Sequence, residues 1–124
     1  MAGYFWAADE MLDRVRSGEI ESKELGIKWT YLNYGDFCTL NVVYVMNPKG
    51  IPFHTHDEHD EVVQVLEGEC EATVGDETRV LKKGDTFFAP KGVPHGIRRS
   101  CTVLSVYGPS FDPQKPDRVF IEKP

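Results

Sequence analysis

The sequence predicts an all-β sandwich or barrel preceded by one short helix. From Trp29 onward, short runs of β-branched and aromatic residues alternate with turn-forming stretches such as NPKG, GDE and KKGD. Turn signals at this frequency are typical of all-β architectures. Apolar residues at helical spacing occur before these runs. With 124 residues, the chain is long enough to bury one core and needs no second domain.

Residues 1–25 are expected to form an N-terminal arm that contains the helix. Met11, Leu12 and Val15 fall on one helical face, and Arg16 lies late in the segment, where a cation favours a helix C-terminus. Gly18 marks the end of the pattern. The arm therefore carries one short helix.

Residues 26–108 form the predicted barrel. Nine strands are expected, at residues 27–32, 37–46, 52–56, 61–67, 69–74, 78–81, 86–89, 95–99 and 102–107. The tail, residues 109–124, follows Gly108 in the stretch GPSFDPQKPD, whose prolines favour a surface connection over a sheet ladder. An edge strand at 118–121 is compatible with the pattern.

A histidine cluster in HTHDEHDE is the first candidate site. Side chains alternate along a strand, so His54 and His56 face the same way with Cα atoms about 6.6 Å apart. After a polar turn, an antiparallel return would bring the Glu61 carboxylate beside them. Taken alone, the histidine pair is equally compatible with an exposed polar turn. His59 and Glu58, in the middle of that turn, are expected to be solvated.

Two longer patterns resemble a known family. His54-x-His56, then Glu61 after four residues and a glycine after six more, resembles the first cupin motif, and GDTFFAPKGVPH (84–95) resembles the second. The resemblance covers about residues 40–107. It implies a cupin-type jelly-roll β-barrel in which His54, His56, Glu61 and His95 hold one metal ion.

Three imidazoles and a carboxylate suit Fe(II), Mn(II), Ni(II), Zn(II) or Cu(II), and they leave coordination positions open. A metal-dependent enzyme acting on a small molecule inside the barrel is therefore the main hypothesis. Dioxygenase, isomerase, lyase and hydrolase chemistry all fit this ligand set. Glu61 would be a ligand and a candidate proton acceptor. The alternative is a non-catalytic metal-containing protein that binds a sugar or small organic acid.

Two further residues are candidates for substrate binding. The asparagine that the second motif would place after its last ligand is Arg99 here, and strand alternation puts Arg99 on the same side as His95. Its guanidinium could bind an anionic group. Tyr44, together with Trp29 and Tyr31, could line a ligand pocket at the barrel mouth.

Composition narrows the partners and the compartment. The net charge of −6, without a long basic cluster, argues against nucleic acid. No stretch approaches the ~20 apolar residues of a membrane span. Three cysteines without CxxC spacing are expected to be thiols in a reducing compartment, which predicts a cytoplasmic protein.

A homodimer is the expected assembly. The apolar segment 37–46 and the aromatic residues Tyr4, Phe5 and Trp6 offer more apolar surface than a small monomer readily buries. The resemblance adds to this expectation, because small cupins are often dimers.

Overall fold

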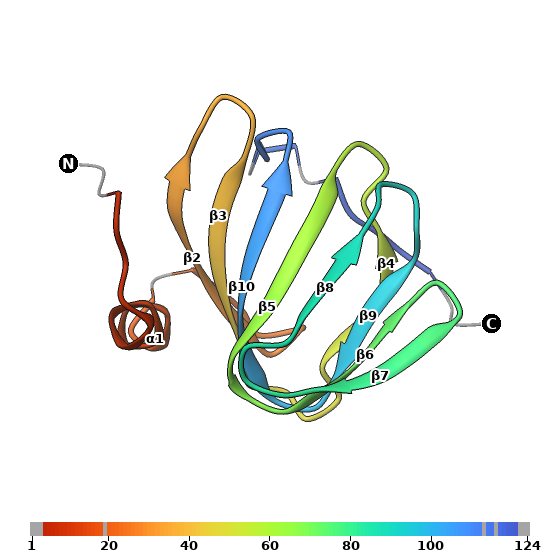
Figure 1. Ribbon diagram of the computed structural model, residues 1–124, viewed down its shortest axis with the longest axis horizontal. Coiled ribbons are helices and arrows are strands. Elements are labelled where there is room, and N and C mark those ends of the chain that lie inside the picture. Colours follow the sequence, from red (N-terminus) through yellow and green to blue (C-terminus); the bar gives the residue numbers. More distant parts are fainter. Residues whose placement is uncertain (1–3, 19, 113, 116, 122–124) are drawn as a thin grey trace.

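The structure is a computed structural model that describes residues 4–18, 20–112, 114–115 and 117–121. One helix precedes two antiparallel sheets that face each other as a jelly-roll barrel (Figure 1). The six-stranded sheet has the order β1 (Ile20–Ser22), β2 (Ile27–Tyr34), β3 (Thr39–Val45), β10 (Cys101–Gly108), β5 (Asp60–Gly68) and β8 (Thr86–Ala89). The five-stranded sheet has the order β11 (Val119–Phe120), β4 (Ile51–Thr55), β9 (His95–Arg98), β6 (Cys70–Val74) and β7 (Glu77–Leu81). The predicted fold class is confirmed.

Helix α1 (Ala8–Arg16) packs on the outer face of the six-stranded sheet (Figure 1). Its apolar face, Met11, Leu12 and Val15, is buried against Val42 of β3. The sequence therefore predicted this helix correctly. One argument for a dimer is weakened, because this helix covers the outer face of β3 within the same chain.

The main core lies between the two sheets and is built by strand alternation. The inward-facing residues that form it include Val43, Val45, Val63, Val65, Cys70, Ala72, Ile97, Cys101 and Val103. Cys70 and Cys101 are buried in this core and Cys38 is half-buried; all three are free thiols. Cys70 and Cys101 therefore act as small buried core residues, whereas Cys38 is only partly covered.

Most strand boundaries agree with the predicted ones to within two residues, and the differences have local causes. Phe37 is 84% exposed and precedes β3, which begins at Thr39. The sequence pattern did not predict β1, a three-residue edge strand whose Ile20 pairs with Trp29 of β2. So short a strand has no recognisable alternation. The edge strand expected in the tail is present as β11 and pairs with β4.

The turn from β4 to β5 differs from the expected hairpin. β4 pairs with β9 and β11, whereas β5 pairs with β10 and β8. The chain therefore crosses from one sheet to the other at residues 56–59. As a result, inward-facing side chains of β4 and β5 meet across the barrel interior instead of lying side by side in one sheet.

None of the helices within the described ranges has the length and apolar character needed to cross a membrane.

Candidate metal centre

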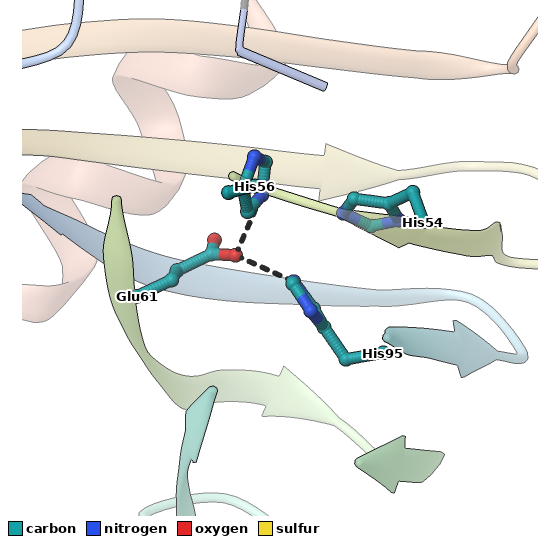
Figure 2. Close-up of side chains that lie close together, drawn as sticks. All are labelled: His54, His56, Glu61 and His95. Carbon is teal, nitrogen blue, oxygen red and sulfur yellow. Dashed lines mark hydrogen bonds and ion pairs between the residues drawn. The ribbon is translucent and has the colours of Figure 1, made fainter. Parts of the chain in front are cut away.

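The four residues expected to hold a metal converge inside the barrel (Figure 2). His54, His56, Glu61 and His95 are all buried, and their candidate ligand atoms lie within 4.8 Å of one another. Three imidazoles and a carboxylate therefore share one small volume between the sheets.

Both sheets contribute to this cluster. His54 on β4 pairs in register with His95 at the start of β9, and their ring centroids are 4.4 Å apart. His56 follows the end of β4, and its ring centroid is 4.9 Å from that of His54. Glu61 comes from β5 in the opposite sheet. The cluster therefore depends on the crossing turn between β4 and β5.

Each histidine is oriented by a main-chain carbonyl. Nδ1 of His54 lies 2.7 Å from the carbonyl oxygen of Pro52, and Nδ1 of His95 lies 3.1 Å from that of Val93. A carbonyl oxygen can only accept a hydrogen bond, so Nδ1 is the protonated nitrogen. The Nε2 lone pair is then free to bind a cation, as in metal sites whose ligands are fixed by outer hydrogen bonds.

Glu61 is held at both carboxylate oxygens. Its Oε1 lies 3.1 Å from Nε2 of His56 and 2.9 Å from Nε2 of His95, while its Oε2 accepts a hydrogen bond from the Ser105 hydroxyl. With Nδ1 protonated, two nitrogen lone pairs and a carboxylate oxygen face one another. Such a set of acceptors requires a cation between them, either shared protons or a metal ion. The residues present therefore fit a bound metal ion.

The electrostatics of the cluster are consistent with this donor set. Burial, together with the neighbouring His95, lowers the pKa of His54 to about 4, so this imidazole is neutral. Burial also opposes the charge on His56, but hydrogen bonding to Glu61 outweighs it and raises the pKa of His56. For Glu61, burial favours the neutral form, yet when protons occupy the space between the groups, hydrogen bonding to His56 and His95 holds the pKa of Glu61 well below the usual range. The carboxylate is therefore ionised.

The cluster lines a cavity of about 270 Å³. Trp29, Tyr31, Tyr107 and Arg118 also line it. The oxygen atom Oδ1 of Asn41, another lining residue, is buried and has no hydrogen-bond partner among the described residues. The cavity therefore combines aromatic walls with the guanidinium of Arg118, the phenol groups of Tyr31 and Tyr107, and the acceptor oxygen of Asn41, which is unpaired within the described part of the chain.

Tyr107 and Arg118 give this cavity its distinctive chemistry. Burial and the nearby Glu61 carboxylate raise the pKa of Tyr107 well above its usual range, so its phenol stays protonated. The guanidinium of Arg118 lies 5.2 Å from the centre of the Phe120 ring, and no carboxylate pairs with it in the part of the chain that the structure describes. The sequence placed both residues in or near predicted strands, but it gave no indication that either would line the cavity.

The structure does not bring Tyr44 and Arg99 to the cavity. Tyr44 faces outward from β3 and packs against the cluster under helix α1. Arg99 follows the end of β9, has a φ of 81°, and directs its Nη1 to Glu69 Oε1 at 3.3 Å on the exposed surface. The left-handed backbone at Arg99 ends the strand alternation on which its expected orientation rested.

The expectation for His59 is wrong. This residue is only 7% exposed, and its Nδ1 donates to Asp117 Oδ2 at 2.7 Å. Its Nε2 lies 3.3 Å from the carbonyl oxygen of Ser110. The C-terminal segment, expected to be a surface connection, covers this turn and buries His59. Glu58 is exposed, as expected.

Known proteins place this architecture in a family. Residues 42–107 match the family described as Cupin domain. An uncharacterised protein of Aquifex aeolicus (strain VF5) is 34% identical over 113 residues, which cover 89% of this chain and 88% of that protein. The pectin degradation protein KdgF of Dickeya dadantii (strain 3937) is 33% identical over 93 residues, 74% of this chain and 83% of that protein.

Solved structures agree with this assignment. The structure of KdgF from Halomonas sp. superposes with a TM-score of 0.71 at 23% identity, and the match covers 81% of this chain and 94% of the other. At this identity the likeness concerns the fold. Together with the family match and the sequence relatives, these observations lead to one conclusion: the chain belongs to the cupin family.

Proposed function

We propose that the protein is a metal-dependent enzyme that converts a small, negatively charged molecule inside the barrel. The observation that carries this proposal is the buried convergence of three imidazoles and one carboxylate at a cavity of about 270 Å³. A buried group of acceptors without a cation would be costly, and a cavity beside it gives a ligand access to the ion.

His54, His56, Glu61 and His95 would hold one divalent transition metal ion, drawn from Fe, Mn, Ni, Zn and Cu. When bound, such an ion supplies a Lewis acid that polarises an oxygen atom of the substrate. The low pKa of Glu61 makes it a weak proton acceptor, so we assign it as a ligand and not as the general base.

Arg118 would bind the anionic group of the substrate. Its guanidinium lines the cavity and offers paired donors that match a carboxylate. Asn41 Oδ1 would accept a hydrogen bond from a substrate hydroxyl, which would satisfy its open acceptor site. The name of the Dickeya relative, pectin degradation protein, is compatible with this chemistry because pectin is built from acidic sugars.

Lyase or isomerase chemistry fits the cavity best. Tyr107 keeps its proton and lies next to the cluster, with its ring centroid 5.3 Å from that of His56. A protonated phenol at this place can donate a hydrogen bond to a substrate oxygen or to the oxygen of a leaving group, and so stabilise negative charge that develops there. Dioxygenase chemistry and non-catalytic binding of a sugar or small acid are the alternatives that the experiment must separate.

The experiment starts with elemental analysis of protein purified without a tag or chelator. We expect one transition metal ion per chain. D-Galacturonate and D-galactose are then compared by calorimetry, together with Arg118→Gln and a matched control, Arg98→Gln, whose guanidinium is exposed and lies 3.6 Å from Glu71. Galacturonate should bind more tightly than galactose, and only Arg118→Gln should remove the difference.

Three results would change the proposal. Absence of a stoichiometric metal ion would reject the metal-dependent function. Oxygen uptake during substrate turnover would favour the dioxygenase. Stoichiometric metal with tight ligand binding, but without turnover of any acidic sugar screened, would favour the binding protein.

We also propose a cytoplasmic homodimer. Free thiols at all three cysteines support a reducing compartment. Tyr4 and Phe5 are 86% and 90% exposed, and this apolar surface supports self-association. Sedimentation at micromolar concentration should give twice 14.1 kDa, and a single species at 14.1 kDa would contradict the dimer.

A further inference from the structure

One of the three histidines depends on a distant part of the chain. His54 and His95 each direct Nδ1 to a carbonyl two residues earlier in their own segments. His56 directs its Nδ1 to the carbonyl oxygen of Asp117, 61 residues away, at 2.5 Å. The orientation of His56 is therefore set by where the C-terminal segment lies.

The Asp117 side chain fastens this segment to the crossing turn. Its Oδ1 accepts a hydrogen bond from the main-chain N–H of Asp57 at 3.0 Å. Its Oδ2 accepts one from the N–H of Glu58 at 2.7 Å and one from His59 Nδ1 at 2.7 Å. The same residue thus holds the turn with its carboxylate and orients His56 with its carbonyl.

Hydrogen bonds attach the C-terminal segment to the barrel at several points. Three donors satisfy the Asp117 carboxylate, and together they outweigh the effect of burial and lower its pKa. On the far side, β11 continues the attachment: Phe120 pairs with His54, and the N–H of Ile121 donates to the Phe53 carbonyl at 3.0 Å. The segment is thus anchored on both sides of Arg118, the residue that lines the cavity.

We propose that Asp117 is a positioning residue of the metal centre, an inference that rests on the metal-dependent function proposed above. The carboxylate holds the turn that joins His56 to Glu61, and it thereby keeps the Asp117 carbonyl in place to fix the Nδ1–H form of His56. The C-terminal segment therefore helps to orient one ligand of the metal centre.

Asp117→Asn tests this role because it preserves the size of the side chain but replaces one acceptor oxygen with an NH₂ donor. Outer hydrogen-bond partners of metal ligands contribute about 10–100-fold in affinity, and we expect a loss in that range for Co(II) in competition with a chelator. The Co(II) absorption spectrum should also change. Asp112→Asn is the matched control, since Asp112 lies in the same segment and is exposed, and its carboxylate accepts only from Gln114 N–H among the described residues.

A second measurement separates positioning from general loosening of the fold. In protein with ¹⁵N-labelled histidine and saturating Zn(II), all three ligand histidines should show protonated Nδ1. In Asp117→Asn, the signals of His56 should shift while those of His54 and His95 stay, because the latter two use local carbonyls. If Asp117→Asn does not fold, His59→Ala replaces it, since it removes only one contact of the carboxylate and should give the same selective shift at smaller size.

The outcomes are distinct. Failure of the wild-type protein to bind Co(II) or Zn(II) would overturn the proposed function itself. Normal metal binding by the wild type, with unchanged affinity and spectrum in Asp117→Asn, would overturn the positioning role alone. Equal shifts at all three histidines would also overturn it, because they would indicate a purely structural effect.

Discussion

The two ends of the barrel interior are built from the same strands but differ in chemistry. Along β5, the inward-facing residues run from Glu61 through Val63 to Val65, and along β10 they run from Tyr107 and Ser105 towards Cys101. Glu61 pairs in register with Tyr107 at one end, and Cys101 pairs with Val45 of β3 at the other. Because side chains alternate along each strand, all of these residues face the barrel interior. Their position along the strand decides whether they lie at the polar end of the interior, with Glu61 and Tyr107, or at the apolar end, with Val65 and Cys101.

This difference separates two kinds of free energy. The apolar end stabilises the fold by removing aliphatic surface from water. The polar end gathers groups whose burial costs free energy unless they are paired or bind an ion. Substitutions at the apolar end should therefore lower the free energy of unfolding, whereas those at the polar end should mainly change metal binding.

The largest effect is expected for His95→Ala. It removes one of four ligands, so the loss of Co(II) affinity should exceed the about 10–100-fold typical of an outer partner. The fold should remain, because the apolar end is untouched. Metal content after dialysis and far-ultraviolet circular dichroism measure the two effects. If the His95→Ala protein keeps its metal ion after dialysis, the assignment of metal binding to the polar end is wrong.

Acidification should weaken metal binding because the imidazoles must be neutral to coordinate. The raised pKa of His56 means that it holds its proton above pH 6.5, whereas His54, with a pKa of about 4, is already neutral there. Affinity should therefore begin to fall above pH 6.5 as pH decreases, by about tenfold per pH unit for one proton displaced. A chelator competition series from pH 8 to 5.5 measures this, and a flat profile down to pH 5.5 would contradict it.

Val65→Ala tests the apolar end. Val65 is only 1% exposed and lies four residues after Glu61 on the same strand, with its side chain on the same inward face. Loss of two methyl groups and the cavity left behind should lower the free energy of unfolding by about 2 kcal/mol. Urea denaturation of metal-free protein measures this, and Co(II) affinity of the folded variant should stay close to that of the wild type. A selective loss of affinity would show that the two ends are not separable.

His59→Ala should have a smaller effect on stability. It leaves the Asp117 carboxylate with two donors in place of three, and the loss of one hydrogen bond should cost about 1 kcal/mol. Glu58→Ala, one residue earlier and exposed, should stay within about 0.5 kcal/mol. Equal thermal midpoints for the two variants would return His59 to the status of a solvated turn residue.

The smallest effect is expected for Arg99→Gly. At a φ of 81°, a residue with a side chain is strained and glycine is not, so the change should stabilise the fold by up to about 1 kcal/mol. Binding of D-galacturonate should be unchanged, since Arg99 lies outside the cavity. Weaker binding in this variant would mean that the guanidinium reaches the ligand after all.

Some residues of the site could be predicted from the sequence and others could not. His54, His56, Glu61 and His95 could be named in advance because their spacing is regular within strands and matches a family pattern. Tyr107 and Ser105 were assigned to a strand, but nothing marked them as neighbours of Glu61. Asp117 and Arg118 were out of reach, since contacts across 58 to 61 residues leave no local periodicity.

By itself, the sequence determined the fold class, the helix, nearly all strands and the four candidate ligands, because each is encoded by local alternation, turn residues or motif spacing. Only the tertiary structure decided which ends of the strands become polar site and which become core, that β4 and β5 belong to different sheets, and that the C-terminal segment covers the crossing turn. The physical reason is that these features depend on pairing between segments far apart in the chain, where sheet register and hydrogen-bond partners are chosen by the packing of the whole barrel.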